Sequence, residues 1–336
     1  MEHDWRALAD RVLAGGWVSK AEALAMLRAD DDELLDLLAA AFAIRRAHWG
    51  RDVHLHLLMN AQSGLCPEDC NYCSQSSVSA AGIEKYPQRD TATILEGARR
   101  AEELGVSTYC IVMSGRGPSD RAVDRMCEAV RRVKAETGLK VCGCFGLLTD
   151  DQAARLKAAG VDRYNHNLNT SERHTPQVVT THGYQDRVGT VEAAKRAGMS
   201  PCSGLIAGMG ETDEDLVDVA FALRALDVDS IPVNFLHSIP GTPLEERHDL
   251  DPNRCLKVLA MVRFVNPEKE IRVAGGREVN LRSLQPLALY AANSIFLGDY
   301  LTTKGQVAEE DRQMIEDLGF RVESRPVPVQ EKKVVA

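Results

Sequence analysis

The chain lacks the patterns that define several large classes of protein. Its 336 residues contain no apolar run of the roughly twenty residues that a membrane-spanning helix needs. Its net charge is -9, and no cluster of lysine and arginine stands out. Because nucleic-acid binding requires such a cluster, we expect neither a membrane protein nor a nucleic-acid-binding protein.

The short motifs of common enzyme classes are also missing. There is no Walker loop for nucleotide phosphates and no Gly-x-Ser-x-Gly elbow of the hydrolases. No Gly-x-Gly-x-x-Gly fingerprint follows the first predicted strand, so we expect any electrons to come from outside the chain. The segment from Met1 to Trp5 is too polar for a secretory signal peptide, and free thiols suit a reducing compartment. We therefore expect a cytoplasmic protein.

Cysteine is the most informative residue type that is present. Nine cysteines are an odd number, and a chain of this length can bury a core without disulfides. Cys66, Cys70 and Cys73 form a Cys-x3-Cys-x2-Cys loop. No second Cys-x2-Cys pair occurs, which disfavours a structural zinc site. Three thiolates at this spacing can instead bind three irons of a 4Fe-4S cluster and leave the fourth iron open for chemistry.

Short apolar runs alternate with longer amphipathic segments along most of the chain. The predicted helices 91–104, 149–159 and 186–197 each end at a glycine that can adopt the left-handed conformation. Eight strands alternating with helices indicate parallel pairing through right-handed crossovers, and thus an α/β fold with a (β/α)8 TIM barrel. The predicted strands are residues 53–59, 107–113, 139–147, 163–168, 201–207, 230–236, 270–274 and 294–297.

The domain organisation follows from the same pattern. We expect residues 51–320 to form one barrel domain. Residues 1–50 are predicted to form helices, over 4–13, 20–29 and 32–49, that pack on the barrel. Residues 321–336, with Pro326, Pro328 and a charged end, are expected to form a flexible C-terminal tail.

Polar and sulfur-bearing side chains occupy strands whose interior positions are normally valine, isoleucine or leucine. Side chains alternate between the two faces of a strand, so Asn165, Asn167 and Asn169 share one face, as do Cys142 and Cys144. A buried amide or guanidinium without a partner costs about 1–3 kcal/mol or more. This pattern therefore predicts a polar ligand or an inorganic centre inside the barrel. Its other members are Cys110, Cys202, Asn234 and Arg272.

The cysteine loop resembles the signature of the radical S-adenosylmethionine (SAM) superfamily, in which the amino and carboxylate groups of SAM bind the open iron. Further segments resemble the biotin synthase family, and the resemblance covers nearly the whole chain. The loop alone indicates only the superfamily, whereas the set of segments is specific. The segments are residues 66–73, 164–168, 202–204, 210–212, 232–234, 241–244 and 275–278.

This resemblance implies a sulfur-inserting transferase of biotin biosynthesis. In that family, SAM is cleaved at the 4Fe-4S cluster to methionine and a 5′-deoxyadenosyl radical, which abstracts hydrogen from dethiobiotin. The substrate carbon then captures sulfide from an auxiliary cluster, usually 2Fe-2S, and a second round closes the ring of biotin. The positions that match the auxiliary ligands are Cys110, Cys142, Cys202 and Arg272.

The resemblance also assigns contacts to SAM and to the substrate. It places Tyr72 against the adenine and Arg187 at the carboxylate of SAM, although the residues alone leave loop packing for Tyr72 and a surface helix position for Arg187 open. The positions that match the cofactor site are Tyr72, Asn167, Asn169 and Arg187. The positions that match the substrate site are Asn165, Asn167 and Asn234.

Two positions depart from the family pattern. Many members carry Asp where this chain has Asn169, so the contact to the SAM ribose lacks a charge. Cys144 lies two residues after Cys142, and it could be a spectator or a further thiolate ligand that changes the nuclearity of the auxiliary cluster or replaces Arg272. Our hypothesis is that Cys144 is dispensable as a ligand.

The remaining candidates have structural interpretations. Cys127 and Cys255 fall in helical patterns and are expected to be buried small apolar residues. His54 and His56 flank the first strand without a carboxylate at a suitable spacing, so we expect them at the surface or at the bottom of the barrel. Glycines within residues 204–208 could allow the backbone to approach a ligand.

The family resemblance also implies partners, namely a flavodoxin or ferredoxin electron donor and a second copy of the chain in a homodimer. Two other functions remain open from the residues themselves. Another radical SAM enzyme acting on a different small molecule would have no reason to keep the cysteines inside the barrel. A non-catalytic iron-sulfur redox sensor would need neither an open iron nor the row of asparagines.

Overall fold

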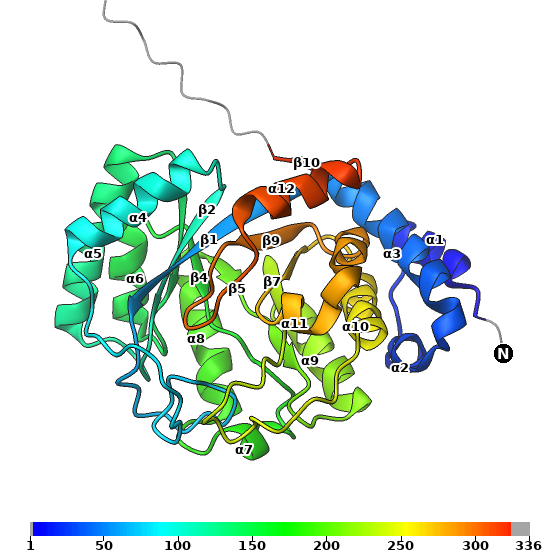
Figure 1. The fold of residues 1–336 in the computed structure, drawn as a ribbon, viewed down its shortest axis with the longest axis horizontal. Coiled ribbons are helices and arrows are strands. Elements are labelled where there is room, and N and C mark those ends of the chain that lie inside the picture. The colour runs from blue at the N-terminus through cyan, green and yellow to red at the C-terminus, as the bar shows by residue number, and fades with distance from the viewer. Residues whose placement is uncertain (1–2, 324–336) are drawn as a thin grey trace, which may run out of the picture.

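A closed barrel of parallel strands ringed by helices forms the centre of the molecule (Figure 1). The computed structural model describes residues 3–323. The strands are β1 (Asp52–Gln62), β2 (Thr108–Met113), β3 (Lys140–Cys144), β4 (Arg163–Asn165), β5 (Ser200–Cys202), β6 (Leu205–Ala207), β7 (Ser230–Phe235), β8 (Glu270–Val273), β9 (Ser294–Leu297) and β10 (Arg321–Val322). They pair in the order β1-β2-β3-β4-β5-β7-β8-β9, and β9 pairs with β1 to close the ring. The predicted (β/α)8 TIM barrel is confirmed.

The fifth predicted strand is divided into β5 and β6, and both parts pair in parallel with β7. Gly204 lies between the two parts, and a Cβ atom there would stand 1.9 Å from the carbonyl oxygen of Pro232 on β7. Only glycine permits so close an approach of two backbones. At Gly204 itself, the backbone that approaches closely belongs to the neighbouring strand β7.

Three helices between strands agree with the sequence predictions, namely α4 (Thr91–Glu103), α6 (Asp150–Ala159) and α8 (Tyr184–Arg196). The glycines that follow them have positive φ angles, with 60° at Gly105, 109° at Gly160 and 80° at Gly198. The left-handed residue that closes each helix is therefore present where the sequence placed it. The other helices of this part are α5 (Asp120–Glu136), α7 (Thr175–Val178), α9 (Asp213–Ala225), α10 (Pro252–Val265), α11 (Arg277–Leu281), the 3-10 helix η2 (Arg282–Tyr290) and α12 (Ala308–Asp317).

The N-terminal helices cover one side of the barrel, where they contact α9 and α10 (Figure 1). They are α1 (Trp5–Leu13), α2 (Lys20–Arg28), the 3-10 turn η1 (Asp31–Glu33) and α3 (Leu34–Trp49). Helix α10 is buried at every residue from Cys255 to Val265. A helix that is apolar on most of its circumference needs cover on both sides, and the N-terminal helices supply the outer cover.

The C-terminal part of the barrel departs from the sequence prediction at Arg321 and Val322. These residues form β10, which pairs in parallel with Asp52 and Val53 at the start of β1. The prediction that the tail begins at residue 321 is therefore wrong for these two residues, because backbone pairing with a distant strand anchors them. Residues 324–336 of the predicted tail, including Pro326 and Pro328, lie outside the described residues.

None of the helices within residues 3–323 has the length and hydropathy that crossing a bilayer requires. The main apolar core lies between the strands and the surrounding helices. A separate small cluster inside the barrel contains Cys110, Cys142, Ala274 and Phe296. The interior is thus divided between ordinary apolar packing and a second region that contains sulfur.

Candidate active site

Ten of the predicted site residues line one cavity inside the barrel, whereas Cys66, Cys70, Cys202 and Arg187 are not part of its lining. This cavity has a volume of about 320 Å³. A larger one of about 1280 Å³ lies beside α1 and α3, but it contains none of the predicted site residues, so we assign the site to the barrel cavity. The predicted residues that line it are Tyr72, Cys73, Cys110, Cys142, Cys144, Asn165, Asn167, Asn169, Asn234 and Arg272.

Strand register brings three cysteines together at the bottom of this cavity. Cys110 on β2 lies opposite Cys142 on β3, so both side chains point to the same face of the sheet. The thiol of Cys142 interacts with those of Cys110 and of Cys202 on β5. All three are buried, with exposed fractions of 4%, 2% and 0% for Cys110, Cys142 and Cys202. This cluster of three thiols is called the inner cysteines below.

Two of the inner cysteines, Cys142 and Cys202, are stabilised as neutral thiols. The neighbouring Cys110 thiol and burial keep the pKa of Cys142 well above its usual range. The neighbouring Cys142 thiol and burial do the same to the pKa of Cys202. Thiols become metal ligands only on losing their protons, and a bound metal centre compensates the resulting charge. None of the nine cysteines forms a disulfide, so the thiols are available.

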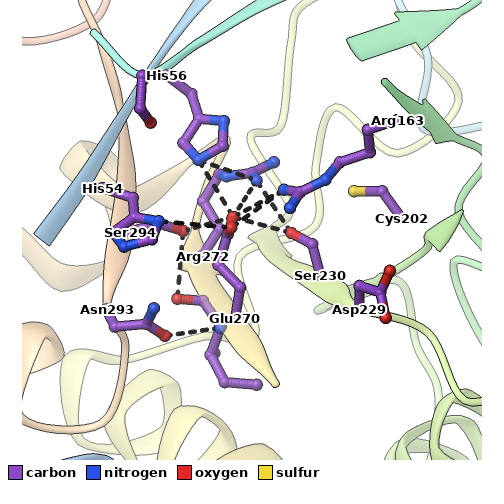
Figure 2. Close-up of polar contacts among 12 residues, drawn as sticks. His54, His56, Arg163, Cys202, Asp229, Ser230, Glu270, Arg272, Asn293 and Ser294 are labelled. Carbon is purple, nitrogen blue, oxygen red and sulfur yellow. Dashed lines mark hydrogen bonds and ion pairs between the residues drawn. The ribbon is translucent and has the colours of Figure 1, made fainter. Parts of the chain in front are cut away.

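Arg272 on β8 completes the bottom of the cavity, with an exposed fraction of 1% (Figure 2). Its Nη2 atom donates to Ser230 Oγ at 3.0 Å and to Glu270 Oε1. The guanidinium lies over the ring of Phe296, with its central carbon 4.9 Å from the ring centre. Its Nε atom is buried and has no hydrogen-bond partner. A buried donor without a partner costs free energy. The unpaired Nε atom is therefore consistent with a further group in the cavity, such as the auxiliary cluster.

The cysteine loop follows β1 and is anchored to the segment after α7. Asp69 accepts hydrogen bonds from the backbone amides of Thr180, at 2.9 Å, and Thr181, at 3.2 Å. Leu65, just before the first cysteine, has a φ angle of 56°, which a non-glycine residue adopts only where its surroundings hold it. The loop is therefore a defined structure rather than an open connection.

The loop thiols lie near the buried cation Arg187. Burial raises the pKa of Cys70 to about 12, while the charge of Arg187 acts in the opposite direction. Arg187 is buried, with an exposed fraction of 6%, and donates from Nη1 to the carbonyl of Asn167 at 2.8 Å. The surface interpretation of Arg187 is therefore excluded. Its guanidinium belongs to the same region as the three loop thiols and Tyr72.

Within residues 3–323, no three cysteine, histidine or acidic side chains lie close enough together to hold a single metal ion. A cubane cluster binds each thiolate through a different iron, so its ligands stand farther apart than those of one ion. The loop supplies three free thiols, Cys66, Cys70 and Cys73, which influence one another electrostatically. This donor set fits a 4Fe-4S cluster with one open iron.

Three asparagines from β4 and the loop after it line the cavity. β4 ends at Asn165, so Asn167 and Asn169 lie in the loop beyond it, and Asn169 has a φ angle of 70°. The Nδ2 atom of Asn165 lies 2.9 Å from Asn167 Oδ1 and 3.2 Å from the sulfur of Cys202. The Nδ2 atom of Asn169 lies 2.6 Å from the hydroxyl oxygen of Tyr72. Asn165 therefore contacts the inner cysteines, and Asn169 contacts the cysteine loop.

Asn234 has a stronger structural role than the sequence indicated. Its Nδ2 atom donates to the carbonyl of Leu205 at 3.1 Å, and its Oδ1 atom accepts from the amide of Gly275 at 3.0 Å. The side chain thus joins β7 to β6 and to the end of β8. One amide hydrogen and one lone pair remain for a ligand in the cavity.

The other cysteines agree with their structural interpretations. Cys127 on α5 and Cys255 on α10 are buried, as expected. Cys144 lines the cavity beside the inner cysteines, and burial raises its pKa to about 12. Its position leaves open whether it binds metal.

Sequence reasoning missed the polar residues below Arg272, which Figure 2 shows around one carboxylate. His56 is 1% exposed, and its Nε2 atom lies 3.1 Å from Glu270 Oε1. Of the two expected locations, the surface is excluded for His56, and its carboxylate partner comes from another strand, which spacing along the sequence does not reveal. Glu270 and Arg163 each stand two residues from a predicted site residue, so the period-two rule could have found them.

Comparisons with known proteins agree with this site. Residues 63–223 match the family model described as the Radical SAM superfamily. Residues 232–321 match the model described as the Biotin and Thiamin Synthesis associated domain. The two matched segments contain every predicted ligand of both clusters.

Curated relatives and solved structures extend the comparison. The chain is 61% identical over 322 residues to biotin synthase from Bacillus licheniformis, covering 96% of this chain and 97% of the relative. It is 60% identical over 322 residues to biotin synthase from Bacillus subtilis, with 96% of each chain covered. Methylornithine synthase has a TM-score of 0.83 at 20% identity, covering 94% of this chain and 97% of that one. An FeFe-hydrogenase maturase from Carboxydothermus hydrogenoformans has a TM-score of 0.81 at 16% identity, covering 95% and 79%. The two structures establish only that the fold is shared.

Proposed function

The chain belongs to the biotin synthase family, and from this membership we propose that it is a radical SAM enzyme that inserts sulfur into dethiobiotin to form biotin. The observation that carries the proposal is one cavity that the cysteine loop borders and that Cys110, Cys142, Arg272 and the asparagines line, with Cys202 in contact with Cys142. A redox sensor has no need of such a cavity. A radical SAM enzyme with another substrate has no need of the inner cysteines.

Two sets of residues are proposed to hold the iron-sulfur clusters. When bound, the first cluster and SAM supply the abstraction of hydrogen, and the auxiliary cluster supplies the sulfur. The ligands of the 4Fe-4S cluster are Cys66, Cys70 and Cys73. The ligands of the auxiliary cluster, taken as 2Fe-2S, are Cys110, Cys142, Cys202 and Arg272.

The remaining cavity residues are proposed to bind and orient SAM and the substrate. Tyr72, Asn167, Asn169 and Arg187 would contact SAM, and Arg187 offers a buried positive charge for its carboxylate. Asn165, Asn167 and Asn234 would contact dethiobiotin, whose ureido ring has both donors and acceptors for amides. The walls of the barrel around the cavity would limit the access of water and hold the reacting carbon in place once SAM and substrate are bound, and an alkyl radical requires both conditions.

The direct test is anaerobic incubation of the protein, loaded with iron and sulfide, with SAM, dethiobiotin and a low-potential reductant. We expect both 5′-deoxyadenosine and biotin, quantified by mass spectrometry. Deoxyadenosine without biotin would indicate a different substrate. Absence of SAM cleavage by protein with intact clusters would contradict any radical SAM activity.

Replacing Cys202 separates the two halves of the proposal. The Cys202→Ala protein should keep the iron bound by the cysteine loop and should still cleave SAM, because Cys202 is not part of that loop. It should form no biotin. Formation of biotin at the wild-type yield would show that the auxiliary cluster is not the sulfur donor.

Family membership also motivates three proposals about the cellular context. We propose that the enzyme is cytoplasmic, that a flavodoxin or ferredoxin donates its electrons, and that it forms a homodimer. Sedimentation of the loaded protein tests the dimer. Reduction by each donor in place of the chemical reductant tests the electron source.

A further inference from the structure

A single carboxylate organises the polar residues beneath the inner cysteines. Glu270 is 3% exposed and begins β8, two residues before Arg272. Its Oε1 atom accepts from Ser230 Oγ at 2.9 Å and from Ser294 Oγ at 3.2 Å, as well as from Arg272. Such a buried charge is tolerated only when several donors satisfy it.

Arg163 on β4 is the second cation held by this carboxylate. Its Nη1 atom lies 3.1 Å from both oxygens of Glu270. Arg163 pairs in register with Cys142, and Figure 2 shows the side chain of Cys202 beside it. Burial acts to lower the pKa of Arg163, but the charge of Glu270 outweighs it and keeps the guanidinium charged. Arg163 therefore lies within electrostatic range of two proposed ligands although it does not line the cavity.

Arg163 is the cation of this group that is not itself a proposed ligand. Glu270 holds its guanidinium beside Cys142 and Cys202, where thiolate ligands would carry negative charge.

We propose that Glu270 is a positioning residue that holds Arg163 and Arg272 against the inner cysteines, and that the positive charge of Arg163 raises the reduction potential of the auxiliary cluster. The inference rests on the proposed function, which places a cluster there. The potential of an iron-sulfur cluster depends on nearby charge and on hydrogen bonds to its sulfurs. A cation stabilises the reduced, more negative state, and an anion destabilises it.

Charge-changing variants test the proposal through opposite effects. Glu270→Gln removes a negative charge with little change of shape and should raise the midpoint potential of the auxiliary cluster. Arg163→Gln removes a positive charge and should lower it. The readout is an anaerobic redox titration of the loaded protein without SAM or dethiobiotin, followed by absorbance. The signals of the auxiliary cluster are those missing from the Cys202→Ala protein.

Two further variants separate charge from structural damage. Arg163→Lys keeps the charge, so its midpoint should lie closer to the wild-type value than that of Arg163→Gln. Asp311→Asn is the matched control, because Asp311 is a fully buried carboxylate that pairs with Arg277 at 2.7 and 2.8 Å and does not line the cavity. It should leave the potential of the auxiliary cluster unchanged.

The outcomes distinguish this inference from the proposed function. Opposite shifts in Glu270→Gln and Arg163→Gln support it, and shifts in the same direction or no shift overturn it. If Glu270→Gln does not fold, the comparison of Arg163→Gln with Arg163→Lys decides, and equal potentials overturn the inference. A wild-type protein without any Cys202-dependent cluster contradicts the proposed function itself, whereas a cluster with unresponsive potential contradicts only the inference.

Discussion

Cysteine shows how one residue type takes different roles according to its neighbours. Cys127 and Cys255 are buried among apolar side chains of helices, where a thiol acts as a small apolar group. Cys70 is equally buried but lies near Arg187 and two other thiols. The number of adjacent thiols and cations, and not burial alone, separates a metal-binding cysteine from a packing one.

The first prediction concerns a ligand of the cysteine loop. Cys66→Ala should abolish SAM cleavage, because two thiolates hold a cubane poorly. Iron and acid-labile sulfide should fall by the amount of one 4Fe-4S cluster, while the inner cysteines keep theirs. Deoxyadenosine formation, measured anaerobically, is the readout. Retained cleavage would count against the assignment of this loop.

The second prediction concerns Cys144. The inner cysteines and Arg272 already supply four ligands, so Cys144→Ala should keep the auxiliary cluster. Its iron and sulfide content and its Mössbauer spectrum should match those of the unmodified protein. Loss of the auxiliary cluster would instead establish Cys144 as a ligand.

Individual elements depend on contacts that reach beyond them, and helix α9 is an example. Its first turn is closed by Thr212 and Asp215, and Asp215 Oδ2 accepts from the Thr212 amide at 2.9 Å. Ser171, just beyond the asparagines, donates to Asp215 Oδ1 at 2.5 Å. The cap of α9 therefore also holds the loop that carries part of the cavity wall.

The third prediction follows from this cap. Asp215→Asn should lower the free energy of unfolding by about 1–2 kcal/mol at neutral pH, because a charged cap is lost. Burial opposes the ionised form, but bonds from Ser171 and Thr212 and the nearby Arg173 prevail and lower the pKa of Asp215. A lowered pKa gives stability that is present above about pH 4 and is lost as the pH falls through the folded-state pKa.

The measurement is urea denaturation of the iron-free protein at pH 7 and near pH 3. The difference between wild type and Asp215→Asn should shrink at the lower pH. The control is Asp218→Asn on the same helix, whose half-exposed carboxylate pairs with Lys20 and should contribute about 0–1 kcal/mol. An equal effect of both substitutions would show that the cap has no special role.

The fourth prediction concerns the junction of β5 and β6. Gly204→Ala should strongly destabilise the protein or prevent folding, because its Cβ atom would overlap the Pro232 carbonyl. Gly189→Ala is the matched control, since no atom lies within 4 Å of a Cβ at that position of α8. It should stabilise the helix by up to about 1 kcal/mol. Thermal unfolding of both proteins checks the pair, and equal melting temperatures would contradict the close packing at Gly204.

The whole molecule combines a continuous apolar core with a chemically distinct interior. The main core extends from the N-terminal helices through the barrel walls. The sulfur-containing cluster lies apart from it and contains few apolar residues. The fold therefore depends chiefly on the first region, and the chemistry depends on the second.

The fifth prediction follows at this scale. Removal of iron with a chelator should leave the far-ultraviolet circular dichroism nearly unchanged, because the main core contains no cluster ligand. The melting temperature should fall, since clusters that bind only the folded state stabilise it. Unfolding of the barrel on iron removal would show instead that the clusters are required for the fold.

Many features were predictable because they depend on residues close together in the chain. Helical and strand periodicity, with glycines such as Gly160 at helix ends, predicted the barrel. The spacing of Cys66, Cys70 and Cys73 predicted three free thiols on one loop, which is the proposed site of the first cluster. Period-two alternation placed Cys142 and Asn165 on the inner faces of neighbouring strands, which the lining of the cavity supports.

What only the tertiary structure decided involves contacts between distant segments. The ion pair of Glu270 with Arg163 joins residues 107 positions apart, and β10 pairs with a strand far earlier in the chain. The close approach at Gly204 and the hydrogen bonds of Asn234 likewise depend on how strands meet. The amino-acid sequence by itself therefore determined the type of barrel and the candidate ligands, because these follow from local periodicity and spacing. The partners of each buried charge were decided by strand register and barrel closure, which no local pattern specifies.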